Sequence, residues 1–142
     1  MQLDKFTDYA LRVLVTLAVR APERVSASAI AQIYALSEHH LAKVASELAR
    51  GGFVVSERGR GGGLTLARPA SQITVGAVVR SLKGDDPVVE CFGTNKSCRI
   101  LPVCGLRTPL AAAQEAFFAS LDQTTLEDVI HPKKAMMDVL LR

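Results

Sequence analysis

The three cysteines of the chain, Cys91, Cys98 and Cys104, all lie within one short segment. Thiolates are soft ligands of the kind that hold zinc or iron–sulfur clusters. The spacing Cys-x6-Cys-x5-Cys contains neither the close Cys-x2-Cys pair typical of structural zinc sites nor a ferredoxin pattern. A cubane iron–sulfur cluster has four iron corners, so three cysteines would leave one corner for another ligand.

Other interpretations of the same three cysteines stay open. A zinc ion could be held by the cysteines together with His131. Two of the thiols could form a reversible disulfide in a metal-free sensor, or all three could simply be packed in an interior. Because the number of cysteines is odd and the N-terminus lacks an export signal, a disulfide framework is disfavoured.

The composition limits the class of protein. The chain has 142 residues, of which 49% are hydrophobic and 22% are charged, as in one ordinary globular domain. No apolar run reaches the roughly 18 residues that span a membrane. We therefore expect a cytoplasmic protein with no membrane partner. The sequence contains no nucleophile–base constellation, so we do not expect an enzyme.

The basic residues are concentrated in the first half of the chain. Residues 1–68 hold nine basic and six acidic side chains, whereas residues 69–142 hold eight of each. Within the first half, Arg58 and Arg60 fall in the run Arg58-Gly59-Arg60-Gly61-Gly62-Gly63. A glycine-rich turn with this local charge predicts a polyanionic partner.

The elements that must position these residues follow from periodicity and caps. Apolar spacing predicts helices over 4–20, 28–35 and 38–50, the last beginning after Ser37 as N-cap. Strand patterns over 53–57 and 64–67 flank the glycine-rich turn. Three helices and a hairpin in this order indicate a winged helix-turn-helix. The outer face of helix 38–50 carries the residues Glu38, His39, Ala42, Lys43 and Ser46.

The second half is predicted to connect this unit to a long helix. A helix over 75–82 follows Thr74, and the cysteine segment comes next. Thr108 as N-cap and Pro109 begin a helix that reaches about residue 121, and Thr124 with Glu127 forms a capping box for a last short helix. We expect a mainly α fold with a small β-hairpin wing. Its regions are residues 1–84 for DNA binding, 85–105 for the cysteines, and 106–142 for a dimerisation helix and tail.

Several stretches carry a family resemblance. They resemble the Rrf2 family of winged-helix iron–sulfur transcriptional regulators, and most closely its nitric-oxide-sensing repressor branch. The stretches are Met1-Gln2-Leu3, Phe6 to Arg12, Leu36 to Val44, Gly52-Phe53-Val54, Arg58 to Leu64, Val89 to Phe92, Cys98, Pro102 to Leu106, Ala116-Phe117, and Thr125-Leu126 with Asp128.

The resemblance implies a homodimer on a near-palindromic operator, paired through the long helix. It also implies a cluster, [4Fe–4S] with [2Fe–2S] as the alternative, held by Cys91, Cys98 and Cys104. The remaining ligand in this branch comes from the N-terminal helix of the other subunit, which corresponds to Asp8. A carboxylate is a hard, weak ligand for iron, which suits an exchangeable corner for a diatomic molecule.

Two positions depart from the family pattern. The cysteine spacing is six and then five residues, where relatives often have five and five. The iron–sulfur assembly regulators of the family have a histidine three residues after the third cysteine, and Arg107 stands there in this chain. That branch is therefore disfavoured, whereas an iron- or redox-responsive branch stays open.

The expected mechanism is repression relieved by nitric oxide. Helix 38–50 of each subunit enters successive major grooves about 34–36 Å apart. Nitric oxide attacks the cluster, the loop 91–104 relaxes, and the operator is released. The base-edge candidates are His39, His40 and Lys43; Ser37 is a phosphate contact; and Arg12, Arg58 and Arg60 supply phosphate or minor-groove contacts.

Overall fold

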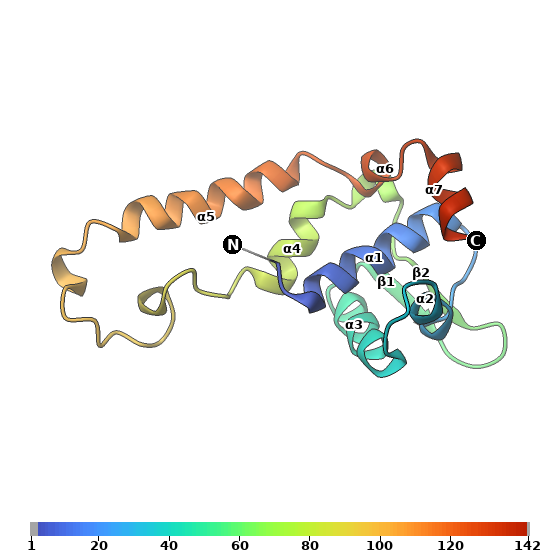
Figure 1. Ribbon diagram of the computed structural model, residues 1–142, viewed down its shortest axis with the longest axis horizontal. Coiled ribbons are helices and arrows are strands. Elements are labelled where there is room, and N and C mark those ends of the chain that lie inside the picture. The colour runs from blue at the N-terminus through green and yellow to red at the C-terminus, as the bar shows by residue number, and fades with distance from the viewer. Residues whose placement is uncertain (1–2, 142) are drawn as a thin grey trace.

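The computed structural model describes residues 3–141, so Met1, Gln2 and Arg142 of the expected terminal regions lie outside the described residues. Within residues 3–141, nine α and β elements and three short 3-10 turns follow one another along an elongated molecule (Figure 1). They are α1 (Lys5–Arg20), α2 (Ala27–Ile33), α3 (Glu38–Arg50), β1 (Val54–Glu57), β2 (Gly63–Leu66), η1 (Ala70–Gln72), α4 (Val75–Lys83), η2 (Glu90–Phe92), η3 (Leu101–Val103), α5 (Arg107–Asp122), α6 (Leu126–Val129) and α7 (Lys133–Leu140).

Helix α1 forms the centre of the core. Its N-cap Asp4 accepts a hydrogen bond from the Thr7 backbone N–H at 2.8 Å, which satisfies one of the free donors of the first turn. Its fully buried side chains include Val13, Leu14 and Leu17, and α2, α3, β2 and α4 bury their apolar faces in the same cluster. The expected helix over 4–20 is therefore confirmed within one residue.

Helices α2 and α3 form the helix-turn-helix. Ser37 caps α3 as expected, accepting from the His40 N–H at 3.5 Å. The turn between the helices is a Schellman-type end, in which the Leu36 N–H donates to the Ala31 carbonyl at 2.8 Å. Ala35 occupies the left-handed position of this turn with φ of 52°, where glycine is usual.

The hairpin is a two-stranded antiparallel sheet in which Val54 faces Leu66 and Glu57 faces Gly63. A bridge between Val25 and Leu64 adds the segment between α1 and α2 to this sheet. Three helices followed by this hairpin make a winged helix-turn-helix, so the expected fold class is confirmed.

The start of α5 differs from the sequence prediction. The helix begins at Arg107 with Leu106 in the N-cap position, and Thr108 is a helical residue instead of the cap. The backbone is already helical at Leu106, so the hydroxyl of Thr108 lies too far along the chain to cap the first turn. In the described chain, none of residues 84–106 is buried.

The predicted capping box is also displaced. It joins Thr125 to Asp128, not Thr124 to Glu127. The Thr124 carbonyl accepts from the Val75 N–H at 2.8 Å, and Thr125 bridges Thr74, so the chain is still in extended pairing at Thr124. The segment then returns to the core, where Leu126 is fully buried and Ile130 nearly so.

Within the described part of the chain, no helix is both long enough and apolar enough to cross a lipid bilayer.

Candidate nucleic-acid interface and cysteine segment

Helix α3 has a buried inner side and an exposed outer face. Leu41, Val44 and Leu48 are buried on its inner side. Ser37, His39, His40 and Lys43 are all exposed on the other side. A helix that is pinned by an apolar stripe and offers small or polar residues outward has the form that enters a major groove.

Glu38 has a structural role on this face. Its carboxylate accepts a hydrogen bond from the Ser28 hydroxyl of α2 at 3.0 Å. The bond joins the first turns of the two helices, which also pack together in the core.

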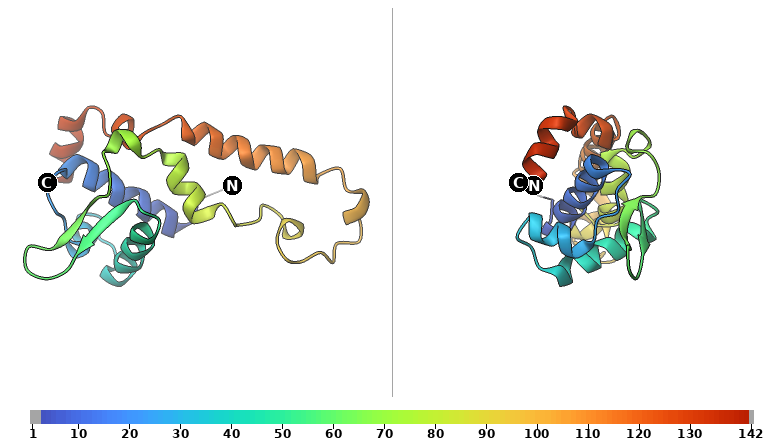
Figure 2. Two further views of the ribbon diagram at one scale, coloured as in Figure 1. Left: turned by 180° about the vertical axis from the view of Figure 1, so that it is seen from behind. Right: turned by 90° about the vertical axis from the view of Figure 1, so that its right-hand side faces the viewer.

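The hairpin tip lies on the same side of the molecule as α3. In Figures 1 and 2, α3 and the loop between β1 and β2 occupy the side opposite α5. Arg58 and Arg60 are exposed in this loop. The expected base-contact and wing residues, although separated by some 20 positions in sequence, therefore share one surface.

Arg12 differs from the other expected DNA contacts because its guanidinium already has partners. It donates to both carboxylate oxygens of Asp8 at 2.7 and 3.2 Å. It also lies over the rings of Tyr9 and Tyr34, at 5.8 and 5.5 Å from their centroids. Asp8 and Arg12, which the sequence assigned to two separate sites, thus form one ion pair on the surface of α1.

The cysteine segment is exposed and locally ordered by short turns. Cys91 lies within η2, and Cys104 directly follows η3. Cys98 lies between them and its carbonyl accepts from the Leu101 N–H at 3.1 Å. Lys96 donates to the Cys91 carbonyl at 2.6 Å. All three thiols are free, with Cys98 exposed and the other two half-buried.

The structure places the three cysteines on one loop without gathering their sulfur atoms. Among residues 3–141, no three His, Cys, Asp or Glu side chains lie close enough together to hold a metal ion. His131 follows α6 in the sequence. Helix α6 lies beyond the end of α5 that is distant from the cysteine loop (Figure 1). Since a helix of 16 residues is about 24 Å long, a zinc site that combines His131 with the cysteines of the same chain is disfavoured.

The donor set nevertheless fits an iron–sulfur cluster. Three free thiols on a single loop supply the soft ligands that such clusters require. The loop has no buried residue to hold another conformation, so binding a group can gather the thiols without disrupting a core. At its end, the Arg107 guanidinium lies 5.8 Å from the centroid of the Phe92 ring, which brings the two ends of the segment together.

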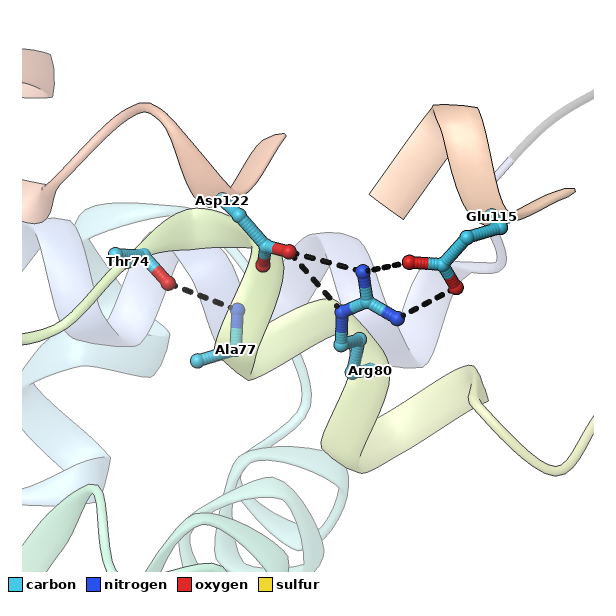
Figure 3. A network of polar contacts seen from close by, with 5 residues as sticks. All are labelled: Thr74, Ala77, Arg80, Glu115 and Asp122. Carbon is cyan, nitrogen blue, oxygen red and sulfur yellow. Dashed lines mark hydrogen bonds and ion pairs between the residues drawn. The ribbon is translucent and has the colours of Figure 1, made fainter. Parts of the chain in front are cut away.

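Helices α4 and α5, which bracket the cysteine loop, are joined by an ionic network (Figure 3). Arg80 of α4 pairs with Glu115 at 2.7 and 3.0 Å and with Asp122 at 2.9 and 3.3 Å. Its guanidinium also lies 5.0 Å from the Phe118 centroid. The hydrogen bonds from Arg80 lower the pKa of Glu115, and those to Glu115 and then Asp122 raise the pKa of Arg80. We call these four residues the Arg80 network.

A second ionic contact joins the end of α4 to the start of α1. Lys83 donates to the Asp4 carboxylate at 2.9 Å and also pairs with Asp86 at the start of the loop. Because Asp4 caps the helix that carries Asp8, the base of the cysteine loop contacts α1 directly.

Comparison with known proteins identifies the family. The profile of the Rrf2 family, described as an iron-dependent transcriptional regulator, matches residues 3–132. The HTH-type transcriptional regulator NsrR of Bacillus subtilis (strain 168) is 44% identical over 142 residues, covering 99% of this chain and 97% of the relative. NsrR of Oceanobacillus iheyensis is 41% identical over 143 residues, with the same coverage of both chains.

Solved structures agree with this assignment. The global cysteine regulator CymR of B. subtilis superposes with a TM-score of 0.66 at 30% identity, covering 91% of this chain and 95% of that one. IscR of T. potens superposes with a TM-score of 0.72 at 26% identity, covering 92% and 86%. Fold and relatives together define a DNA-binding transcriptional regulator with a winged helix. The chain belongs to the Rrf2 family.

Sequence reasoning missed the residues that position the site instead of forming it. Arg24 contacts the hairpin, Arg80 joins α4 to α5, and Lys83 joins α4 to α1. Their partners lie 33, 35 and 79 positions away, so no local pattern connects them. The sequence does contain one signal for these three residues. Each is a charged residue at the end of an element or on a partly buried helix face.

Proposed function

We propose that the chain is a cytoplasmic repressor that binds operator DNA as a homodimer and responds to nitric oxide through an iron–sulfur cluster. Cys91, Cys98 and Cys104 would hold the cluster. One observation carries this proposal: three free thiols occupy a loop that has no core of its own and is joined at both ends to helices that contact the DNA-binding unit. The choice of nitric oxide as the signal rests on the resemblance to the nitric-oxide-sensing branch of the family.

In this proposal the DNA-binding residues act in two groups. His39, His40 and Lys43 contact base edges, because they are exposed on the outer face of α3. Ser37 at the start of α3 contacts a phosphate, and so do Arg58 and Arg60 at the hairpin tip. Arg12 contacts a phosphate through the guanidinium donors that do not pair with Asp8.

The dimer contact is proposed along α5. A groove of about 530 Å³ runs between α4 and α5, and its walls are mainly apolar, including Val79, Leu110, Phe117 and Leu121. Leu106 at the start of the helix is 63% exposed. Burying these side chains against a second copy would remove apolar surface from water, and two-fold pairing of α5 would place the α3 helices on one side of the dimer.

The cluster would be held by the three thiolates of one subunit and by Asp8 of the other. When bound, an iron–sulfur cluster supplies iron atoms that react with nitric oxide. The residues of this chain would set the response: the three thiolates would gather the loop, and iron would be held by the Asp8 carboxylate, which pairs with Arg12 in this structure. Since a carboxylate binds iron weakly and a paired Arg is at hand, Asp8 is suited to the exchangeable corner.

A change in the loop reaches α3 through two contacts. The Arg80 network makes α4 and α5 move together, and the Lys83–Asp4 pair transmits a shift of α4 to the start of α1. Helix α1 packs against α3 in the core. A small tilt is sufficient to release DNA, because a dimer must meet two half-sites at once.

The decisive experiment uses protein purified without oxygen. We expect a brown preparation that contains iron and sulfide, and operator binding that is lost when nitric oxide is added. Cys98→Ala should abolish the chromophore, whereas Ser97→Ala, a neighbouring exposed residue, should leave it unchanged. Cluster-loaded protein that keeps its operator affinity after nitric oxide would refute the sensing proposal.

The same preparation separates the alternatives. A colourless protein with one zinc per chain indicates a structural zinc site. Peroxide-dependent disulfide formation with full DNA binding after chelation indicates a metal-free thiol sensor. Release of DNA by iron chelation, with no response to nitric oxide, indicates an iron-responsive regulator.

A further inference from the structure

The side chain of Arg24 spans the turn of the hairpin wing. This residue lies between α1 and α2, outside the hairpin itself. Its Nη2 donates to Oε1 of Glu57 at 2.8 Å, and its Nη1 donates to the carbonyl of Gly61 at 3.3 Å. Glu57 is the last residue of β1, so one guanidinium holds both ends of the turn that carries Arg58 and Arg60.

The backbone beside Arg24 is held against the wing as well. Val25 and Leu64 exchange two hydrogen bonds, of 3.0 and 2.8 Å. A Cβ at Gly63, where φ is 143°, would lie 3.1 Å from the backbone of Val25, so the two segments are in close contact. The backbone of Arg24 is therefore fixed relative to the hairpin, and its guanidinium contacts the wing from a defined position.

The charge of Glu57 calls for a reason. It is an acidic side chain within a basic turn, and it would oppose the approach of phosphate. The Arg24–Glu57 pair is also exposed, at 46% and 50% of the side chains, and exposed ion pairs contribute little to folding stability. The presence of a carboxylate at position 57 is therefore explained neither by electrostatic attraction to DNA nor by a contribution to global stability. Ordering of the wing turn does explain it.

We infer that Arg24 and Glu57 are positioning residues for DNA binding: their ion pair fixes the wing turn so that Arg58 and Arg60 are presented in one arrangement before DNA is met. The inference rests on the proposed contact between the wing and DNA, and it is independent of the cysteine loop. An ordered turn loses less conformational entropy on binding, which increases affinity without a new contact.

The test compares variants of the full-length protein on operator DNA. Glu57→Ala removes a negative charge, so simple electrostatics predicts tighter binding. Positioning predicts the reverse, a loss of affinity of up to about fivefold, the upper end of the range expected for one exposed ion pair. Glu57→Gln keeps an oxygen that accepts from Arg24 and should retain most of the affinity. The control is Glu23→Ala, which removes a carboxylate beside Arg24 in the segment between α1 and α2. Glu23 pairs with Arg20 and not with the wing, so this variant should not bind DNA more weakly.

A local readout accompanies the affinities. In Glu57→Ala, the Gly62 amide, which donates to the Gly59 carbonyl at 3.0 Å, should exchange its hydrogen faster while the thermal midpoint stays unchanged. Equal or tighter operator binding by Glu57→Ala overturns the inference, since Arg24 would then be an ordinary phosphate contact released by the substitution.

The wing contact itself is checked separately. Replacing both Arg58 and Arg60 by alanine removes four arginines from a dimer and should reduce the slope of log affinity against log salt by about 3.6. If this double variant binds like the wild type, the wing makes no DNA contact, and the inference fails together with that part of the proposed function. If the double variant shows the expected loss but Glu57→Ala does not bind more weakly, only the positioning role of Arg24 and Glu57 is wrong.

Discussion

At the scale of single residues, Ala35 shows how a helix-turn-helix tolerates local strain. It adopts φ of 52° at the position after the end of α2, where an L side chain is unfavourable. We expect Ala35→Gly to raise the free energy of unfolding by about 0.5–1 kcal/mol, after allowance for the greater chain entropy of glycine. Urea unfolding measures this difference.

The matched control is Ala42→Gly, at an exposed position inside α3. Here glycine should lower the free energy of unfolding by about 1 kcal/mol. A loss of stability in both variants would contradict the strain assigned to Ala35.

A second prediction at this scale separates base contacts from phosphate contacts. Lys43→Ala should weaken operator binding by roughly 1–3 kcal/mol for each half-site and relax the preference at one base pair of each half-site. Arg58→Ala removes one arginine from each subunit, so it should weaken binding to every sequence alike and reduce the salt slope of the dimer by about 1.8. Titrations against a set of singly substituted operators give both quantities. A uniform loss across that set for Lys43→Ala would move this residue to the phosphate group.

A third prediction concerns the pH dependence of Asp4. Hydrogen bonds from Lys83 and then from the Thr7 backbone lower the pKa of Asp4 from 3.8 to about 2. Since the folded pKa lies below the unfolded value, this stabilisation is complete above pH 3.8 and is lost as the pH falls through about 2. In Lys83→Met, the pKa of Asp4 should rise towards 3.8, as followed by the carboxyl carbon shift. An unchanged midpoint would exclude the Lys83 contact.

At the scale of elements, the packing of α4 against α5 depends on Gly76. A Cβ at this position would lie 2.0 Å from Oδ1 and 2.5 Å from the backbone nitrogen of Asp122. Because the backbone atom cannot move aside without displacing α5, Gly76→Ala should destabilise the protein by about 1–3 kcal/mol. Thermal unfolding checks this value, with Gly105→Ala as the control because nothing lies within 4 Å of a Cβ there. Equal stability of the two variants would contradict the close contact.

The elements also show what the sequence could predict. Helix α3 was predictable to the residue because its cap, its apolar stripe and its terminal glycine are all local signals. The start of α5 was predicted wrongly. Thr108 and Pro109 have the sequence pattern of a helix start, but the helix already begins at Arg107, after Leu106. The capping box slipped by one residue because the Thr74–Thr125 bridge is a pairing between distant segments.

The candidate site was predictable in kind and less so in arrangement. Cysteine spacing and the basic turn are local patterns; the turn residues Arg58 and Arg60 are exposed, and the cysteines lie on one loop, with Cys98 exposed and the other two half-buried. The pairing of Asp8 with Arg12 joins two residues that the sequence had assigned to different sites, although their separation of four positions on one helix permits it. Arg24 and Glu57 depend on the folding of the hairpin against the α1–α2 segment, which no local window contains.

At the scale of the whole molecule, the proposed dimer makes a geometric prediction about its operator. Two α3 helices on one side of the dimer require half-sites separated by one helical turn, about 10–10.5 base pairs. Insertion of five base pairs at the operator centre turns one half-site to the opposite side of DNA. Affinity should then fall roughly a thousandfold, to the non-specific level.

The control changes the identity of the central base pairs without changing their number, and binding should be kept. Gel-shift titrations at fixed salt compare the two operators. Equal affinity for the lengthened operator would mean that two chains bind their half-sites independently.

The return of α6 to the core has a wider consequence. Leu126 and Ile130, which follow α5, are buried against side chains of α1 and the N-terminal helices. The cysteine loop and α5 are therefore an insertion within the DNA-reading module, not an appendage at its end. This arm cannot be replaced by that of another protein through a single junction in the chain. Both of its ends connect to the same DNA-reading module, so two junctions must match at once.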